Sequence, residues 1–373
     1  MFDKTKELCR QFLAMGVPGI DMIVYKDGEE VLRHKCGYVD LENKIPVQGD
    51  ELYNIYSCSK PITVTAAMQL WEKGLFDVED ELSKYMPEFK EMTVQTEEGI
   101  VPAKNPIRIR NLFTMTAGFT YDLRSPQLMK LREDTDGRCP TREVARYLAR
   151  EPLAFEPDTQ YRYSLGHDVL AALVEVLSGE KFEVYVKKNI FEPCGMTRSD
   201  FLKDPAEYDE VATHYVFRDG KPQLRDKWPA YRLGTEHASG GAGCVSTVEE
   251  YIKFAEGLRT FKLLKPETIA YMTRDWLTEE QKKTFPQIAF HYGLGVRSRE
   301  SDPVMADFGW GGAAGATLHV DIRNGVSVYY SQHLLLSPNQ GIRTRVYSAV
   351  MEDLGYDVRA ELPMDPNANN LTY

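Results

Sequence analysis

Segments with strand patterns lie near both ends of this 373-residue chain, far apart in the sequence. The apolar run 20–25, a Lys-Asp-Gly-Glu turn and the segment 31–38 together predict an antiparallel hairpin. Residues 316–321 and 326–331, on either side of an Arg-Asn-Gly turn, predict a second hairpin. Strands at both ends of one chain favour a single α/β (α+β) domain that contains both termini.

The rest of the chain is dominated by helical patterns. Apolar side chains recur every three or four positions in the segments 3–15, 61–75, 141–150, 167–177 and 342–354, which predicts a helix in each. The middle of the chain, residues 77–235, shows little two-residue alternation, so it is expected to be mainly helical.

The length of the chain permits two or three domains of about 150 residues each. We expect a discontinuous α/β domain formed by residues 1–76 and 236–373. A mainly helical domain, residues 77–235, would be inserted between its two halves.

The charge balance limits the partners of the protein. Lys and Arg number 45 against 56 Asp and Glu, which gives a net charge of −11. An acidic chain lacks the positive field that attracts phosphates, so we expect no nucleic-acid partner. No apolar stretch reaches the ~18 residues of a membrane span, so we expect no membrane partner either.

Two features favour a cytoplasmic location. The segment Met1–Cys9 carries charges where a secretory signal has its apolar region. The six cysteines occur singly, with no Cys-x-x-Cys pair, as is typical of reduced thiols.

A Ser-x-x-Lys motif, Ser57-Cys58-Ser59-Lys60, stands at the start of the predicted helix 61–75. Residues three apart share one face of a helix, which brings the Lys60 amine near the Ser57 hydroxyl. A desolvated lysine can lose its proton and act as a base, and a helix N-terminus stabilises negative charge that develops beside the serine. The motif fits an activated nucleophile, and taken alone it fits a helix cap as well.

Other motif matches are interpreted as structural. Ser178-Gly179-Glu180-Lys181 repeats the spacing, but it follows a long predicted helix and its glycine marks a helix end. Ser239 lacks a Gly-x-Ser-x-Gly elbow, because His237 stands where the first glycine should be. The Gly309–Ala314 segment fits Gly-x-Gly-x-x-Ala but precedes a strand, so no dinucleotide cofactor is expected. The seven histidines form no zinc-binding motif, so no metal is expected.

Six segments in a common order resemble the serine β-lactamase and penicillin-binding-protein superfamily, in particular class C β-lactamases and the related family VIII carboxylesterases. They are Gly16–Gly19, Tyr56–Thr63, Leu82–Phe89, Ile109–Phe119, Phe191–Met196 and Gly240–Thr247. The resemblance covers most of the chain, and the ordered set is more specific than any one segment. It implies a β-lactamase/transpeptidase-like fold, in which helices flank an antiparallel sheet and a helical domain is inserted.

The resemblance also implies roles for individual residues. Ser57 would be the acylated nucleophile and Lys60 its proton partner. The family's tyrosine-x-asparagine element corresponds to Tyr163-Ser164-Leu165, so Tyr163 would be the general base, with Tyr161 as the alternative. A phenol has a reference pKa of ~10, so this role needs Lys60 nearby to favour the ionised or proton-sharing form. The backbone N–H groups of Ser57 and Ala313 would form the oxyanion hole.

Two departures from the family pattern bear on the substrate. The family's lysine-threonine-glycine element is replaced by Trp310-Gly311-Gly312, which is similar to the element of some family VIII esterases but lacks the lysine that helps to hold a penicillin carboxylate. Leu165 replaces an asparagine that would hydrogen-bond the amide side chain of the drug. Trp310 and Leu165 would instead suit a neutral ester with a hydrophobic part. Tyr121 is a candidate for the acyl pocket, although a purely structural aromatic fits it equally well.

We therefore expect a serine hydrolase, a carboxylesterase that cleaves small neutral esters through a Ser57 acyl-enzyme and needs no cofactor. The enzymatic alternative is a D-amino-acid peptide hydrolase (D,D-peptidase) or a weak class C-like β-lactamase. The other alternative is a catalytically inactive homologue that only binds its ligand.

Overall fold

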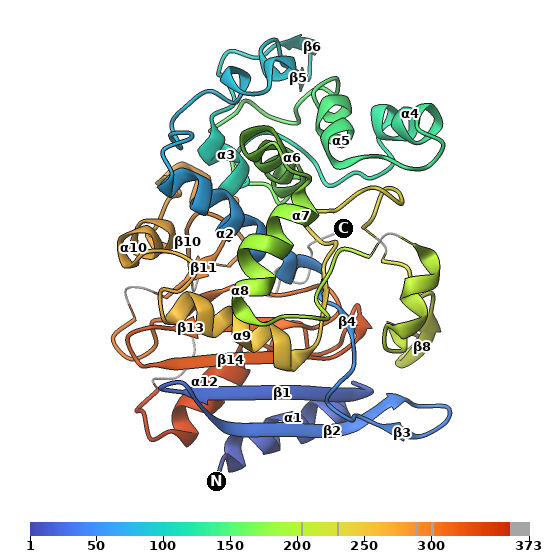
Figure 1. Ribbon diagram of the computed structural model, residues 1–373, viewed down its shortest axis with the longest axis vertical. Coiled ribbons are helices and arrows are strands. Elements are labelled where there is room, and N and C mark those ends of the chain that lie inside the picture. The colour runs from blue at the N-terminus through green and yellow to red at the C-terminus, as the bar shows by residue number, and fades with distance from the viewer. Residues whose placement is uncertain (203, 230, 288–289, 300–301, 359–373) are drawn as a thin grey trace.

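The computed structural model describes residues 1–202, 204–229, 231–287, 290–299 and 302–358. Eight strands of this part of the chain form one sheet, in which β1 pairs with β14 and thereby joins the two ends of the chain (Figure 1). In sheet order, the strands are β10 (His291–Tyr292), β11 (Arg297–Ser298), β12 (Phe308–Gly309), β13 (Thr317–Asp321), β14 (Val326–Ser331), β1 (Gly19–Lys26), β2 (Glu29–Asp40) and β3 (Ile45–Pro46). Neighbouring strands in this sheet are antiparallel.

Both faces of the sheet are buried at its centre, because alternate side chains of β1 and β14 enter different hydrophobic clusters. Met22 and Val24 of β1 pack with the helices α1 (Asp3–Ala14) and α12 (Arg345–Asp353). Ile23 faces the main core, which includes α9 (Val248–Arg259) and α2 (Ser59–Glu72). The first strand of the hairpin is mostly apolar because both of its faces are buried, whereas a strand with one solvent-exposed face would alternate apolar and polar residues.

A helical region covers the α2 side of the sheet and lies above it in Figure 1. Its helices are α3 (Ile109–Phe113), α4 (Pro126–Asp134), α5 (Thr141–Leu148), α6 (Gly166–Ser178), α7 (Phe182–Val186) and α8 (Glu192–Cys194). Helix α6 is apolar along most of its length and contacts α2, α3 and α5. As a result α2 is almost wholly buried between this region and the sheet.

The fold class is confirmed, and so are both hairpins and the helices expected from the periodicity. The middle region also contains strands, which the sequence analysis did not expect. They are β5 (Thr93–Thr96), β6 (Gly99–Pro102), β7 (His214–Arg218) and β8 (Lys221–Arg225), and β7 also pairs in parallel with β15 (Leu334–Leu335). The Asp219-Gly220 turn between β7 and β8 has two positive φ angles, 52° and 75°, the geometry that a tight hairpin prefers. The division into two domains stays a prediction.

Two short strands lead the chain into the region of Ser57. β4 (Tyr53–Asn54) pairs with β9 (Val245–Ser246), and the backbone N–H of Ile55 donates to the Cys244 carbonyl at 3.2 Å. This pairing brings the glycine-rich segment 240–243 beside the start of α2. Two more helices, α10 (Pro266–Thr273) and α11 (Glu279–Lys282), precede β10. Within the described ranges, no helix combines the length and apolar character that crossing a membrane requires.

Candidate active site

Ser57 lies in a single 3-10 turn, Tyr56–Cys58, that continues directly into α2. Tyr56 has a φ of 48°, a left-handed conformation that is uncommon for a bulky residue and must be held by its surroundings. The Tyr56 hydroxyl is 3.3 Å from Nε2 of His214, and the Tyr56 carbonyl accepts a hydrogen bond from Ser59 Oγ at 2.7 Å. These contacts fix the turn that presents Ser57.

Lys60 approaches Ser57 as its spacing predicted. Its Nζ donates to Ser57 Oγ at 3.2 Å and to the Gly241 carbonyl at 2.7 Å, and the side chain is fully buried. Burial lowers the pKa of Lys60 to about 7, although the negative charge of Asp168 acts in the opposite direction. A substantial fraction of Lys60 is therefore neutral near pH 7 and can accept a proton.

Tyr163 also contacts the serine. Its hydroxyl donates to Ser57 Oγ at 2.6 Å, and Lys60 Nζ lies 4.5 Å from the centre of its ring. Burial raises the pKa of Tyr163 and outweighs the hydrogen bonds to Ser57 and Trp310, which act to lower it. We expected Lys60 to favour an ionised or proton-sharing phenol; the raised pKa favours the protonated phenol, which donates its proton to Ser57 Oγ. The alternative base, Tyr161, is buried in an aromatic cluster, with its ring 5.2 Å from that of Tyr292.

Tyr163 is held between two aromatic rings. Tyr121 stacks on one side, with centroids 5.5 Å apart and planes 4° apart. Trp310 stacks at 6.0 Å and 12°, and its Nε1 donates to the Tyr163 hydroxyl at 3.4 Å. Tyr121 and Trp310, both predicted to line the site, therefore contact Tyr163.

The segment Trp310-Gly311-Gly312 follows β12 and passes close to the start of the Ser57 turn. A Cβ on Gly312 would lie 2.3 Å from the Ile55 carbonyl oxygen, so only glycine fits at this position. Ala313 packs in the same small cluster as Tyr56. The placement is compatible with an oxyanion hole at Ser57 and Ala313, which stays a prediction.

Leu165 was expected to contact the substrate. The structure instead places its side chain in the main hydrophobic core with 1% exposure, immediately before α6. Its backbone N–H donates to the Thr120 carbonyl at 3.1 Å, next to Tyr121. The side chain contributes to core packing, because the chain turns inward here to begin a buried helix.

A buried carboxylate next to Lys60 was missed by the sequence analysis. Oδ1 of Asp168 accepts a hydrogen bond from Ser239 Oγ at 2.6 Å and lies 3.2 Å from Nε2 of His237. All three side chains are at most 1% exposed. The available signal was an aspartate in the first turn of the largely apolar helix α6.

Two guanidinium groups near Gly311 were also missed. A Cβ on Gly311 would lie 3.3 Å from Nη2 of Arg343 and 3.9 Å from Nη1 of Arg297. Arg297 is 4% exposed, and its Nε and Nη2 have no hydrogen-bond partner among the described residues. Although Trp310 replaces the motif lysine, these two guanidinium groups still place positive charge at this edge of the site. The sequence had suggested an uncharged site that suits a neutral ester.

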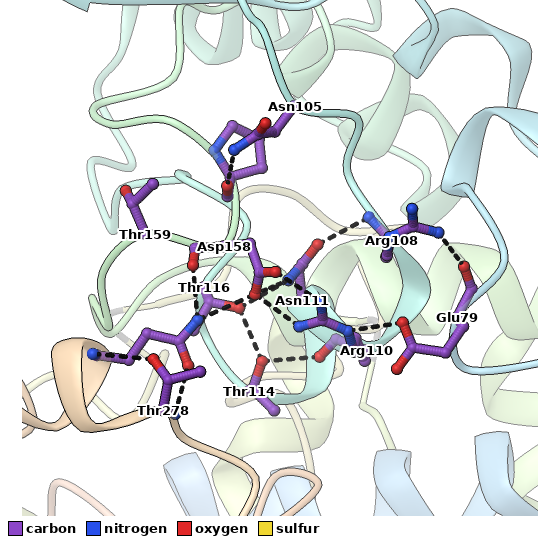
Figure 2. Close-up of polar contacts among 12 residues, drawn as sticks. Glu79, Asn105, Arg108, Arg110, Asn111, Thr114, Thr116, Asp158, Thr159 and Thr278 are labelled. Atoms are coloured by element: carbon purple, nitrogen blue, oxygen red, sulfur yellow. Dashed lines mark hydrogen bonds and ion pairs between the residues drawn. The ribbon is translucent and has the colours of Figure 1, made fainter.

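A polar network anchors the loop that carries Tyr163 (Figure 2). The Asp158 carboxylate accepts two hydrogen bonds of 2.6 Å from Arg110, one of 3.2 Å from Asn111 and one of 2.9 Å from Gln281. It thus ties α3 and α11 to the segment that leads into Tyr163. Asp158 has a φ of 73°, so this anchor also fixes an unusual turn.

These observations agree with a comparison to known families, in which the beta-lactamase family model matches residues 5–346. The chain belongs to the beta-lactamase family. It is a family of hydrolases that share the fold described above. One homologue of this chain is an esterase.

Individual beta-lactamase-family relatives are similar along most of their length. Protein Rv1367c of Mycobacterium tuberculosis (strain ATCC 25618 / H37Rv) is 28% identical, with 85% of each chain covered. Esterase EstB of Burkholderia gladioli is 28% identical, with 83% of this chain and 84% of EstB covered. Among solved structures, EstCE1, a hydrolase with promiscuous acyltransferase activity, is 26% identical and superposes with a TM-score of 0.77, covering 93% of this chain and 97% of EstCE1.

Proposed function

We propose that this beta-lactamase-family protein is a serine carboxylesterase that forms an acyl-enzyme on Ser57. The observation that carries the proposal is the double contact of Ser57 Oγ, which lies 3.2 Å from Lys60 Nζ and 2.6 Å from the Tyr163 hydroxyl. A nucleophile between a buried amine and a partly buried phenol has a proton acceptor and a proton donor within reach. The similarity to the esterase EstB and the hydrolase EstCE1 supports the same class of reaction.

In this mechanism neutral Lys60 accepts the Ser57 proton as Oγ attacks the ester carbonyl. The oxyanion is stabilised by the backbone N–H groups of Ser57 and Ala313. Tyr163 gives its proton to the departing alcohol and recovers one from the Lys60 ammonium. Water then attacks the acyl group and transfers a proton to the same pair, Ser57 regains its proton, and the carboxylic acid is released.

The experiment compares hydrolysis of short-chain p-nitrophenyl esters by the wild type, Ser57→Ala and a matched control, Ser178→Ala. Ser178 belongs to the second Ser-x-x-Lys match, at the end of α6, where its hydroxyl donates to the Val174 carbonyl at 2.7 Å. We expect Ser57→Ala to lose at least about 1000-fold in kcat/KM and Ser178→Ala to retain the wild-type rate. Equal activity of Ser57→Ala and the wild type would refute the proposal.

Covalent labelling separates the esterase from a homologue that only binds. We expect a fluorophosphonate to add one adduct per chain, located on Ser57 by mass spectrometry. A folded protein that is not labelled at Ser57 would favour the inactive alternative.

The arginines beside Gly311 support a second candidate, a hydrolase of substrates that carry a carboxylate, such as a D-amino-acid peptide. Arg343 and Arg297 both approach Gly311, and guanidinium groups bind carboxylates well. The two candidates are distinguished by matched esters with and without a carboxylate on the alcohol part, assayed beside a D-alanyl peptide and a cephalosporin. A kcat/KM for the peptide or the cephalosporin far above that for every ester would reverse the order of preference.

A further inference from the structure

Asp168 is held in one orientation by contacts on a single oxygen. Its Oδ1 accepts a hydrogen bond from Ser239 Oγ at 2.6 Å and lies 3.2 Å from His237 Nε2. Nδ1 of His237 accepts the backbone N–H of Leu233 at 3.2 Å, so the ring proton is on Nε2, the nitrogen that lies 3.2 Å from the carboxylate. The other oxygen, Oδ2, is buried and has no hydrogen-bond partner among the described residues.

Asp168 Oδ2 and Lys60 Nζ both border a small gap beside Gly241, where a larger residue would place its Cβ. A Cβ at residue 241 would lie 2.7 Å from Asp168 Oδ2, 3.5 Å from Lys60 Nζ and 3.5 Å from the Tyr121 hydroxyl. Gly241 has no Cβ to fill the space next to both groups, and its carbonyl accepts a hydrogen bond from Lys60 Nζ at 2.7 Å. Both side chains are buried, and Coulomb interactions between buried groups are stronger than at a surface.

The other groups around Lys60 are neutral at physiological pH. From the Ser57 turn, the serine hydroxyl and the Cys58 thiol approach, and burial raises the pKa of that thiol to about 12. The rings of Tyr163 and Tyr121 lie 4.5 and 5.5 Å from Nζ.

On α6, next to Asp168, burial lowers the pKa of His167 to about 3, so His167 is neutral as well. Burial by itself would raise the pKa of Asp168, but hydrogen bonds from His237 and Ser239 and the charge of Lys60 hold it below its usual value. Asp168 is therefore the carboxylate whose charge acts on Lys60, and it raises the pKa of the amine against the effect of burial.

We propose that Asp168 is a positioning residue for the reaction: its carboxylate, fixed by His237 and Ser239, acts across the gap at Gly241 to set the charge state of Lys60. This inference rests on the proposed role of Lys60 as the base for Ser57. Burial alone would favour the neutral amine over the ammonium, and Asp168 restores part of the stability of the ammonium. Lys60 can then accept the serine proton and keep it until Tyr163 has protonated the departing alcohol and takes a proton back from the ammonium.

The test is the pH dependence of Asp168→Asn, measured as fluorophosphonate labelling of Ser57 and as p-nitrophenyl ester hydrolysis between pH 5 and 9. Asparagine keeps the Oδ1 acceptor and removes the charge. Without that charge Lys60 loses its proton more readily, so the rise of the rate with pH should move to lower pH by about one unit or more. A folded Asp168→Asn whose rise stays at the wild-type pH would overturn the inference.

Ser239→Ala is the matched control, because it removes a hydrogen bond from Asp168 and leaves the charge. Its midpoint should stay within a few tenths of a pH unit of the wild type, whereas a shift as large as that of Asp168→Asn would indicate a structural effect and refute the proposal.

If Asp168→Asn does not fold, Gly241→Ala provides the second test. Its methyl group must displace the Asp168 carboxylate, so we expect a smaller shift in the same direction. An unchanged midpoint in this variant would contradict the proposal.

Absence of Ser57 labelling in the wild type would instead refute the proposed function. Failure of the positioning role and failure of the enzyme assignment therefore give different results.

Discussion

The indole of Trp310 stacks on the ring of Tyr163 at 6.0 Å and donates its Nε1 proton to the Tyr163 hydroxyl at 3.4 Å. The first residue of the Trp-Gly-Gly element therefore supports the phenol that contacts Ser57. A lysine here would place a second cation beside Lys60, whereas tryptophan orients Tyr163 without adding charge. The replacement thus changes the electrostatics of the site as well as its substrate contacts.

Trp310→Phe should keep the stacking and lose the hydrogen bond to Tyr163. A net hydrogen-bond contribution of about 0.5–1.5 kcal/mol predicts a fall of roughly 2- to 10-fold in kcat/KM for ester hydrolysis, with little change in thermal stability. Trp310→Ala should also destabilise the fold by about 3–5 kcal/mol, because Trp310 packs against Tyr292 in a buried aromatic cluster. Steady-state kinetics and denaturant unfolding separate the two effects, and an unchanged rate in Trp310→Phe would argue against the role in orienting Tyr163.

The pH–rate profile should report the titration of Lys60. Burial lowers the pKa of Lys60 to about 7, and the amine must be neutral to accept the Ser57 proton. We therefore expect kcat/KM to fall about tenfold per pH unit below this pKa and to level off above it. Tyr163→Phe should lower the rate but keep the midpoint of the rise. If the midpoint disappears with the phenol, Tyr163 is the group that titrates.

Asp158→Asn should destabilise the protein by about 1.5–3 kcal/mol, because Arg110 loses a two-point charged contact in the network of Figure 2. Glu79→Gln is the control: it removes the more exposed partner of Arg110 and should cost less than about 1 kcal/mol. Urea unfolding measures both, and equal losses would contradict the central role of Asp158.

This Asp158 contribution should also depend on pH. Burial by itself would raise the pKa of Asp158, but Arg110, Gln281 and Asn111 hold it below its ordinary value of 3.8. Its stabilisation is therefore complete at neutral pH and is lost as the pH falls through the folded-state pKa. The difference in stability between the wild type and Asp158→Asn should accordingly shrink in acid.

Gly312→Ala should abolish activity or folding, because its Cβ would lie 2.3 Å from the backbone oxygen of Ile55, next to the Ser57 turn. Gly311→Ala should be milder, since its nearest neighbour, at 3.3 Å, is the flexible end of Arg343. Ester hydrolysis and thermal melting of both variants test this contrast. Equal losses of activity and stability in the two variants would contradict the view that glycine is required at 312 by the nearby Ile55 backbone.

The fold was largely predictable because its elements are encoded locally. Hairpin turns and helical periodicity marked the hairpin β1–β2, the hairpin β13–β14 and the helices α1, α2 and α6. The strand pair β7–β8 was missed although Asp219-Gly220 is a strong turn signal, because the surrounding residues lack clear alternation. The pairing of β7 with β15 joins residues about 120 positions apart and has no local signature.

For the site, the sequence by itself predicted the Ser57–Lys60 contact, because residues three apart at the start of a helix share one face. Only the tertiary structure decided which tyrosine meets Ser57, since packing buries Tyr161 in an aromatic cluster and brings the Tyr163 hydroxyl to the serine. It also decided the electrostatics of the site. Asp168, Arg297 and Arg343 reach the site from separate elements, and a pKa depends on burial and on neighbours through space, neither of which sequence spacing specifies.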